Sequence, residues 1–377
     1  MWLLILVLFV LQRYHSPQLA GITAFLAIVP GLLLAPIAGA LLDRHGRTRL
    51  VVADYLIAAF AAALIATLSA LHQLPQPLLL VIVAIASLTN PLSIAGARTL
   101  FPVIAPREMW ERANALDSSG HVIASLVAAP LAGVLVGLVG GEWALAAAAA
   151  IFGLAALVML RLPDPSTGVE GSILRNAWLG LQYVVRNATL RGIAITMFTL
   201  NLGTGALTII LPVLVLDRLH QGPATVGILL GIESLAGLGA ALMAGRMKTE
   251  GRERSLMLGG MIVTTFSIAL LPFATSLSMV VLSVVLFGLA MGPFDIGLFT
   301  IRQRRVDPAW FGRAFAVSMA INYVGAPIGS ALAGPFIAWS LNGALWVAVA
   351  ICAVSTLLPL LAIPAKDDRL LPSRTER

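Results

Sequence analysis

The chain has 377 residues, of which 59% are hydrophobic and only 11% are charged, and its formal net charge is +7. A soluble domain carries about 25% charged residues, so this composition excludes a soluble globular enzyme, a disordered protein and a fibre. The apolar residues come in runs that can cross a bilayer as helices of about 20 residues. A run such as 143–162 does not alternate as a transmembrane barrel strand would.

The apolar segments predict an all-α polytopic membrane protein with twelve spans, the first of them truncated. Met1–Leu11 is apolar but covers only about half a bilayer. It lacks the basic start and the small-residue cleavage site of a signal peptide, so we interpret it as the distal half of a first helix. The other eleven predicted spans are 19–43, 50–72, 76–101, 113–138, 142–162, 192–216, 223–245, 256–275, 278–301, 313–337 and 341–364.

The basic residues divide unequally between alternate loops. If the loop at 43–49 is cytoplasmic, 22 of the 24 Lys and Arg residues face the cytoplasm, and only Arg13 and Arg218 lie on the other side. Cytoplasmic loops of membrane proteins carry this excess of basic residues. The charge therefore predicts a multi-pass protein of the bacterial inner (plasma) membrane with a cytoplasmic C-terminus. We therefore interpret the basic residues as facing the cytoplasm and the headgroups of the lipid bilayer, and not as a nucleic-acid-binding surface.

The spans are expected to form two six-helix bundles, one at 1–162 and one at 192–364. Between them lies a predicted cytoplasmic linker at 163–191, and a cytoplasmic tail follows at 365–377. Around Trp178 the linker repeats apolar residues at helical spacing, which predicts an amphipathic helix on the membrane surface.

The two halves of the chain resemble each other at four places in the same order. Leu11–His15 matches Leu216–His220, and Ala129–Pro130 matches Ala326–Pro327. Such a repeat predicts two parallel bundles related by a pseudo-two-fold axis along the membrane normal. The first copy has about 13 fewer residues before its landmark than the second, so either helix one is short or the start codon is misassigned.

A charged motif, Gly39–Ala–Leu–Leu–Asp–Arg–His–Gly–Arg–Thr–Arg49, stands between the second and third predicted spans. It resembles the signature loop of the major facilitator superfamily, G-x-x-x-D-R-x-G-R. The resemblance implies a secondary transporter that alternates access by rocking two bundles around a midplane site. It also implies that the motif is a gate, with Arg98 as the expected partner of Asp43. The predicted gating residues are Gly39, Asp43, Arg44, Gly46, Arg47, Arg49 and Arg98.

Further stretches resemble the macrolide-efflux and enterobactin-exporter branch of that family. They are the linker segment 180–187 and the segment 98–116. Ala129–Gly133 loosely resembles the G-P-x-x-G motif of family exporters, with alanine in place of the first glycine. The resemblance implies export of a hydrophobic or amphipathic compound.

Ionisable residues inside the spans are candidates for coupling, because each costs about 2.5–3.5 kcal/mol at the bilayer centre. Glu233 lies midway along its span, where burial favours the neutral, proton-carrying form of a carboxyl; a structural hydrogen bond is the alternative. Asp295 faces either the cavity or the arginine cluster at 302–305. Asp117 and His121, four residues apart, share a helix face and form either a coupling pair or a local polar pair.

Other polar residues within the spans have simpler expected roles. Asp54 lies near the end of its span, where we expect it to pair with the arginines of the motif. The predicted cavity-lining residues are Asn201, Thr204, Thr208, Asn322 and Tyr323.

The sequence therefore predicts a proton-coupled exporter of small amphipathic or hydrophobic compounds that works as a monomer. Its single cysteine, Cys352, lies in an apolar run, and the chain has no metal-ligand spacing or catalytic constellation, so we expect no enzyme, cofactor or metal. Two alternatives stay open. One is an importer of a small polar solute, and the other is a non-transporting membrane protein such as a sensor, an assembly partner or a decayed transporter.

Overall fold

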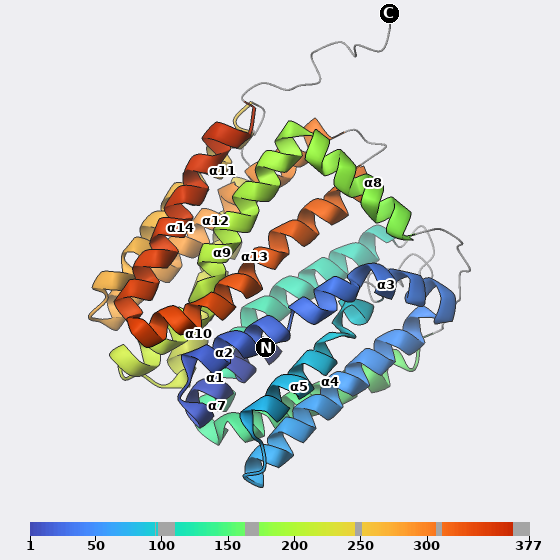
Figure 1. Ribbon diagram of the computed structural model, residues 1–377, viewed down its shortest axis with the longest axis vertical. Helices are drawn as coiled ribbons and strands as arrows, with labels where there is room; N and C mark the ends of the chain where they lie inside the picture. Colours follow the sequence, from blue (N-terminus) through green and yellow to red (C-terminus); the bar gives the residue numbers. More distant parts are fainter. Residues whose placement is uncertain (95, 97–109, 163–172, 246–250, 307–310, 365–377) are drawn as a thin grey trace, which may run out of the picture. The chain divides into compact units, whose positions relative to one another are not determined.

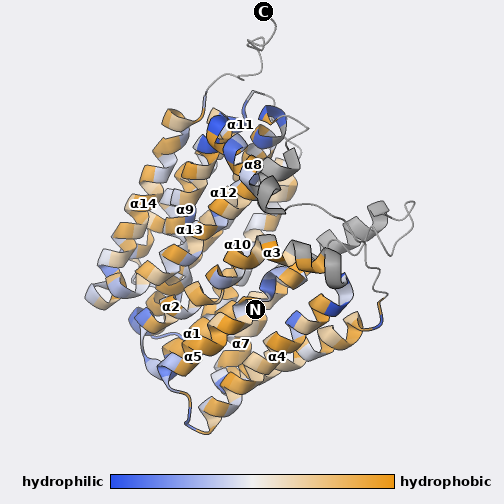
Figure 2. Ribbon diagram, turned by 45° about the vertical axis from the view of Figure 1, so that its right-hand side comes forward, coloured by the Kyte–Doolittle hydropathy of each residue, from blue (hydrophilic) through white to orange (hydrophobic). Residues whose placement is uncertain are grey.

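The computed structural model describes residues 1–94, 96, 110–162, 173–245, 251–306 and 311–364. Every regular element in these ranges is a helix, and nine of these helices are long and apolar enough to cross a membrane (Figure 1). The predicted all-α polytopic membrane fold is therefore confirmed. Hydrophilic residues lie mainly at the helix ends and turns (Figure 2).

In the first half of the chain, two predicted spans are joined and two are divided. The helices are α1 (Trp2–Tyr14), α2 (Pro17–Leu26), α3 (Val29–His45), α4 (Arg47–Ala70), α5 (Gln76–Ser87) and α7 (Trp110–Met159). α7 holds both the fifth and the sixth predicted span, which meet at Gly140, where a φ of 84° interrupts the helix. The second predicted span is divided into α2 and α3, and the fourth is interrupted between Ser87, where α5 ends, and Asn90, where helical structure resumes.

In the second half, the predicted spans correspond to single long helices with short irregular turns at two ends. The elements are α8 (Ile173–Arg186), α9 (Ala188–Val213), the π-helical turn η2 (Leu214–Arg218), α10 (Pro223–Ala244), α11 (Glu253–Ala269), the 3₁₀ turn η3 (Leu271–Phe273), α12 (Leu277–Arg305), α13 (Phe311–Trp339) and α14 (Leu341–Ala362). α8 is amphipathic: Val184 is buried with Leu190 and Val306, whereas Trp178 is 60% exposed.

The two copies of the repeat end their helices in the same way. His15 follows α1 with a φ of 49°, and His220 follows η2 with a φ of 50°. A non-glycine residue with positive φ is uncommon. The shared conformation at matching positions therefore supports the repeat found in the sequence.

By internal contacts the chain forms two units, and each unit takes segments from both halves of the sequence. The first unit comprises Met1–Leu174, Thr208–Gly231 and Ser330–Leu341. The second unit comprises Arg175–Leu207, Ile232–Gly329 and Asn342–Arg377.

The short helix α1 forms the core of the first unit. Its residues Ile5 to Val10 are almost completely buried, and it packs against α2 and α7. The contact with α7 is close, because a Cβ added to Gly141 would lie 2.8 Å from Cδ2 of Phe9. A helix with apolar residues on all of its faces suits such a central, buried position.

Large apolar side chains also cover the outside of the helices. Leu138 is 79% exposed and Trp339 is 80% exposed. Lipid tails are as apolar as these side chains, so exposure to a bilayer costs them nothing. This exposure is what a membrane protein requires and what a soluble protein avoids.

Within the second unit, glycines let helix backbones touch. A Cβ added to Gly205 of α9 would lie 2.5 Å from the Cα of Ala326 on α13, and one added to Gly325 would lie 3.1 Å from the Cβ of Asn201. Small residues at helix contacts are the main means by which membrane helices approach closely.

We expect Gly205→Val to destabilise the purified protein, because the new side chain meets the α13 backbone, which cannot move aside as a side chain can. The expected loss is about 1–3 kcal/mol, measured as a lower unfolding temperature in detergent. Gly239→Val is the matched control, because nothing lies within 4 Å of a Cβ at Gly239. Equal unfolding temperatures for the two variants would contradict this account of the α9–α13 contact.

Candidate functional site

The second unit contains a cavity of about 270 Å³ between α9, α12 and α13. Its wall combines methionine, leucine and aromatic side chains with a few polar groups. The lining residues are Met197, Leu200, Asn201, Thr204, Phe287, Met291, Phe294, Asp295, Leu298, Phe299, Met319, Asn322 and Tyr323. An apolar wall with a few placed polar groups is the usual composition of a small-molecule site.

Asp295 is the acidic group of this cavity. Its side chain is exposed to the cavity rather than packed in the core, and within the described residues it has no hydrogen-bond or ion-pair partner. Three phenylalanines and Tyr323 share the wall with it. A carboxylate surrounded by aromatic rings and methionines favours the charged head of an amphipathic cation.

A buried polar network holds the wall of the cavity in place. Arg302 of α12 is 1% exposed, and its Nη1 donates to the Sδ of Met319 at 3.0 Å. The Asn322 amide is oriented with its oxygen toward Arg302 and its nitrogen toward the Ser318 carbonyl, at 3.0 Å. Asn201 Nδ2 donates to the backbone oxygen of Asn322 at 2.9 Å. Arg302 is not itself among the lining residues. It contacts Asn322 and Met319, which do line the cavity, and so holds their side chains in position.

Glu233 lies apart from these lining residues, on α10. It is partly buried, and Gly288 of α12 packs directly on its backbone carbonyl. Its carboxyl has no partner among the residues whose placement is described. A second ionisable group therefore lies inside the unit without a structural hydrogen bond that would explain its presence.

The structure brings together most of the polar residues predicted to line a cavity. Asn201, Thr204, Asn322, Tyr323 and the coupling candidate Asp295 surround one space. Thr208 falls in the first unit and is not among the lining residues. The methionines and phenylalanines of the wall gave no signal in the sequence, because apolar residues fill every span.

Three of the predicted gating residues lie within the described side chains. Gly46 joins α3 to α4 with a φ of 94°, and Arg47 and Arg49 belong to the first turn of α4. The other predicted residues lie outside the described side chains, namely Gly39, Asp43, Arg44, Arg98, Asp117 and His121.

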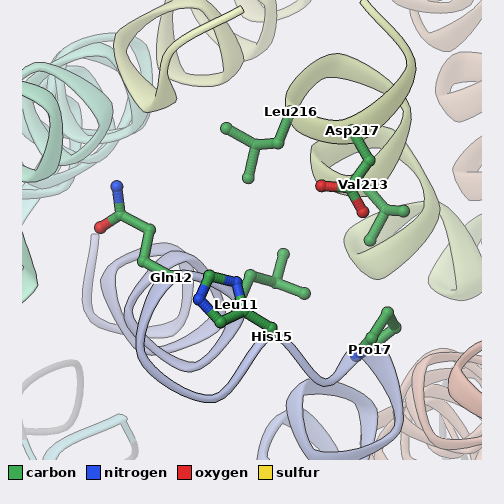
Figure 3. Close-up of a pocket in the computed structure, with 7 residues that line it drawn as sticks. All are labelled: Leu11, Gln12, His15, Pro17, Val213, Leu216 and Asp217. Atoms are coloured by element: carbon green, nitrogen blue, oxygen red, sulfur yellow. The ribbon is translucent and has the colours of Figure 1, made fainter. Parts of the chain in front are cut away.

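A smaller cavity, of about 200 Å³, lies in the first unit between the matching ends of the two repeats. Figure 3 shows Gln12 and His15 on one side and Asp217 on the other, with apolar side chains between them. The lining residues are Leu11, Gln12, His15, Pro17, Val213, Leu216 and Asp217. The polar side chains of this cavity, Gln12, His15 and Asp217, are exposed, so the cavity is open rather than enclosed.

In the same unit, α7 and α10 pack with almost no side chain between them. A Cβ on Gly133 would lie 2.7 Å from the Cα of Gly227, and a Cβ on Gly137 would lie 3.3 Å from the amide nitrogen of Ala224. Gly231 likewise packs on the ring of Pro130. Ala129–Gly133, the segment that resembles an exporter motif, therefore forms this contact between the two halves of the sequence.

Comparisons with known proteins place the chain in a family. The family model described as Major Facilitator Superfamily matches residues 1–247 and 193–377, so the chain belongs to this superfamily of membrane transporters. The MFS-type transporter y4rN of Sinorhizobium fredii (strain NBRC 101917 / NGR234) is 38% identical over 371 residues, covering 97% of this chain and 91% of its own.

Two more distant relatives are named as efflux proteins. The multidrug efflux pump Tap of Mycolicibacterium fortuitum is 25% identical, covering 86% of this chain and 82% of its own. Macrolide efflux protein A of Streptococcus pyogenes is 21% identical, covering 88% of this chain and 84% of its own. The predicted likeness to the macrolide-efflux branch is confirmed, as is the expectation of a transporter rather than an enzyme.

A solved structure supports the fold. The nucleoside transporter NupG aligns with a TM-score of 0.76 at 15% identity, covering 95% of this chain and 93% of its own. At that identity the likeness concerns the fold alone.

We expect Gly227→Val to loosen the contact between α7 and α10. In a Cys352→Ser, Ala224→Cys background, this change should raise the labelling rate of Cys at position 224 by a membrane-impermeant maleimide several-fold. Gly153→Val serves as the control, since nothing lies within 4 Å of a Cβ there. The account fails if the two valine variants label at the same rate.

Proposed function

We propose that the protein is a secondary active exporter of small amphipathic or hydrophobic compounds, driven by protons. The observation that carries the proposal is the cavity of the second unit, where methionine and aromatic side chains surround the unpartnered carboxyl of Asp295. The named activities of Tap and of macrolide efflux protein A support the direction of transport.

The cavity wall favours amphipathic cations over other solutes. Methionine adapts to ligands of different shapes, because its unbranched side chain has several rotatable bonds. Phe287, Phe299 and Tyr323 offer ring faces, and Asp295 supplies one negative charge. A compound with an apolar body and one basic nitrogen matches this combination best.

Alternating access supplies the transport cycle in this proposal. The α7–α10 contact through Gly133 and Gly227 closes one side of the path and must separate when that side opens. In the proposed topology this side faces away from the cytoplasm. The motif residues around Asp43 gate the cytoplasmic side, between bundles at 1–162 and 192–364.

The proposed setting is the bacterial inner membrane, with the C-terminus in the cytoplasm and a single chain as the working unit. The 22 basic residues assigned to cytoplasmic loops support this orientation. α8, with Val184 buried and Trp178 exposed, suits a linker helix at the lipid surface.

Import of a polar solute is the rival function. The amides of Asn201 and Asn322 are the groups that would favour it, but both already take part in the network that joins α9 and α13. Accumulation of a panel of amphipathic dyes and antibiotics, in cells with and without the gene, separates the two functions. Lower accumulation with the gene indicates export, higher accumulation indicates import, and equal accumulation of every compound rejects the proposal.

We expect Asp295→Asn to reduce export of cationic compounds at least ten-fold while sparing neutral ones. The reason is that the substitution keeps the size of the side chain and removes only the charge that faces the cavity. Efflux of a cationic dye and of a neutral dye from preloaded cells provides the measurement. An equal loss for both dyes would instead indicate a structural role for Asp295.

Glu233→Gln tests proton coupling separately from substrate binding. We expect efflux against a gradient to be lost, because the amide cannot take up or release a proton, while dye binding to the purified protein is retained. Efflux rates at several external pH values provide the measurement. Full-rate export with unchanged pH dependence would remove Glu233 from the coupling mechanism.

A further inference from the structure

The two copies of the repeat meet around the smaller cavity, of about 200 Å³, at the ends of α1 and η2. Leu11 matches Leu216 in the repeat, and both residues line the cavity. Gln12 matches Asp217, and these two residues line it as well. Matched residues that surround one space lie around the pseudo-two-fold axis that relates the two copies. In the proposed transporter this axis runs along the membrane normal, so the cavity lies in line with the transport path.

The symmetric position carries an asymmetric charge. At matching places on the wall, Gln12 contributes a neutral amide and Asp217 contributes a carboxylate. Figure 3 shows this carboxylate directed from η2 toward the end of α1. Within the described part of the chain it has no hydrogen-bond or ion-pair partner. The cavity therefore offers a negative group that the protein itself leaves available.

The backbone differs between the two copies at the turn that carries this carboxylate. At the end of α1 the His15 amide donates to the Leu11 oxygen at 3.1 Å, a step of four residues. At the matching end, the Leu219 amide donates to the Leu214 oxygen at 3.1 Å, a step of five residues, which makes η2 a π-helical turn. A π turn is wider than an α turn, so it changes the direction of the side chains that it carries. Such turns occur frequently at functional sites.

The neighbouring arginines do not line this cavity. Arg13 follows Gln12, but its Nη2 lies 2.8 Å from Nδ1 of His72, in the turn after α4. Arg218 follows Asp217 and is also absent from the wall. Most of the other lining side chains are apolar, namely Leu11, Pro17, Val213 and Leu216. An apolar wall with one carboxylate repeats the combination found in the cavity of the second unit.

We propose that Asp217 and Gln12 form a second, weak binding site for small amphipathic cations at the extracytoplasmic end of the path. The charged nitrogen of such a compound pairs with the carboxylate, and its apolar part lies against Leu11 and Leu216. The polar groups of the cavity are exposed to water, which weakens an ion pair. Weak binding suits a site from which a substrate is released. The extracytoplasmic position follows from Arg13 and Arg218, the two basic residues assigned to that side.

The role of this site in release rests on the proposed export of cationic compounds, whereas binding at Asp217 does not. Asp295, the carboxyl of the proposed substrate cavity, belongs to the second unit, and Asp217 belongs to the first. The experiment therefore measures binding rather than transport, and it uses an Asp295→Asn background to remove the charge of the other cavity. Absence of export and absence of this site are then separate results.

The test titrates benzyltrimethylammonium, which has one ring and one fixed charge, into the purified full chain in a non-ionic detergent, with ligand-observed NMR as the readout. Asp217→Asn should weaken binding about three- to five-fold, the range expected for an exposed ion pair. Glu142→Gln is the matched control: it removes one charge from the same unit outside the cavity, and the new amide oxygen still accepts the Ser69 hydrogen bond. That variant should bind as the background protein does.

Exchanging the charge between matching positions locates the ligand. Gln12→Glu adds a second carboxylate to the wall and should strengthen binding about three-fold. The double variant Asp217→Asn, Gln12→Glu moves the carboxylate to the other copy of the repeat and should restore the affinity that Asp217→Asn loses.

Cysteine labelling provides an independent location. In a Cys352→Ser, Leu216→Cys version of the same background, benzyltrimethylammonium should slow maleimide labelling of the cysteine at position 216. Benzyl alcohol, which has the ring without the charge, and tetramethylammonium, which has the charge without the ring, should slow it less at equal concentration.

Two results would overturn the proposal. One is equal affinity in Asp217→Asn and Glu142→Gln, and the other is equal slowing of the labelling by benzyl alcohol and benzyltrimethylammonium. Gln12→Glu keeps the test decisive if Asp217→Asn does not fold, since an unchanged affinity in that variant also rejects the site. Binding that depends on Asp217 in a protein that exports nothing would support this site and reject the proposed function.

Discussion

The absence of water in the hydrocarbon core is the constraint on which this structure depends. Each backbone N–H and C=O group inside a bilayer must find its partner within the chain, and a helix provides that along one segment. The described spans are accordingly helical, and each departure needs a local compensation. At the break between α5 and Asn90, side-chain hydroxyls and the Asn90 amide bond to carbonyls near the two interruptions.

Close helix packing follows from the same constraint. Because lipid tails are as apolar as leucine, burying leucine against a neighbouring helix gives little driving force, and contact between backbones matters more. Gly205 against Ala326 and Gly133 against Gly227 are contacts of this kind. The first joins helices within one cavity wall, whereas the second joins the two halves of the sequence and must separate if access alternates. Polar groups such as Arg302 then fix the orientation of the wall.

The sequence predicted the site unevenly, for physical reasons. Polar residues stand out against an apolar span, so Asn201, Asp295 and Asn322 were found in advance. Met291 and Phe287 were not, because nothing in an apolar run distinguishes a side chain that faces a cavity from one that faces lipid. Asp54 follows the motif arginines along the chain, and only the structure shows that its buried carboxyl also lies beside Thr89 and Ser93 of the fourth span. The short first helix gave no hint that it is the buried core of a unit.

By itself the sequence determined that the protein lies in a lipid bilayer. It also determined the approximate spans, the internal repeat and the family. These follow from composition, from charge spacing and from matching segments, all of which can be read from the sequence without a structure. Only the tertiary structure decided which way each helix faces, where helices break, and which distant residues meet around one space. The physical reason is that an apolar helix is equally compatible with lipid and with protein on any side. Its rotation is set by contacts such as Gly325 against Phe198, which exist only after the helices have packed.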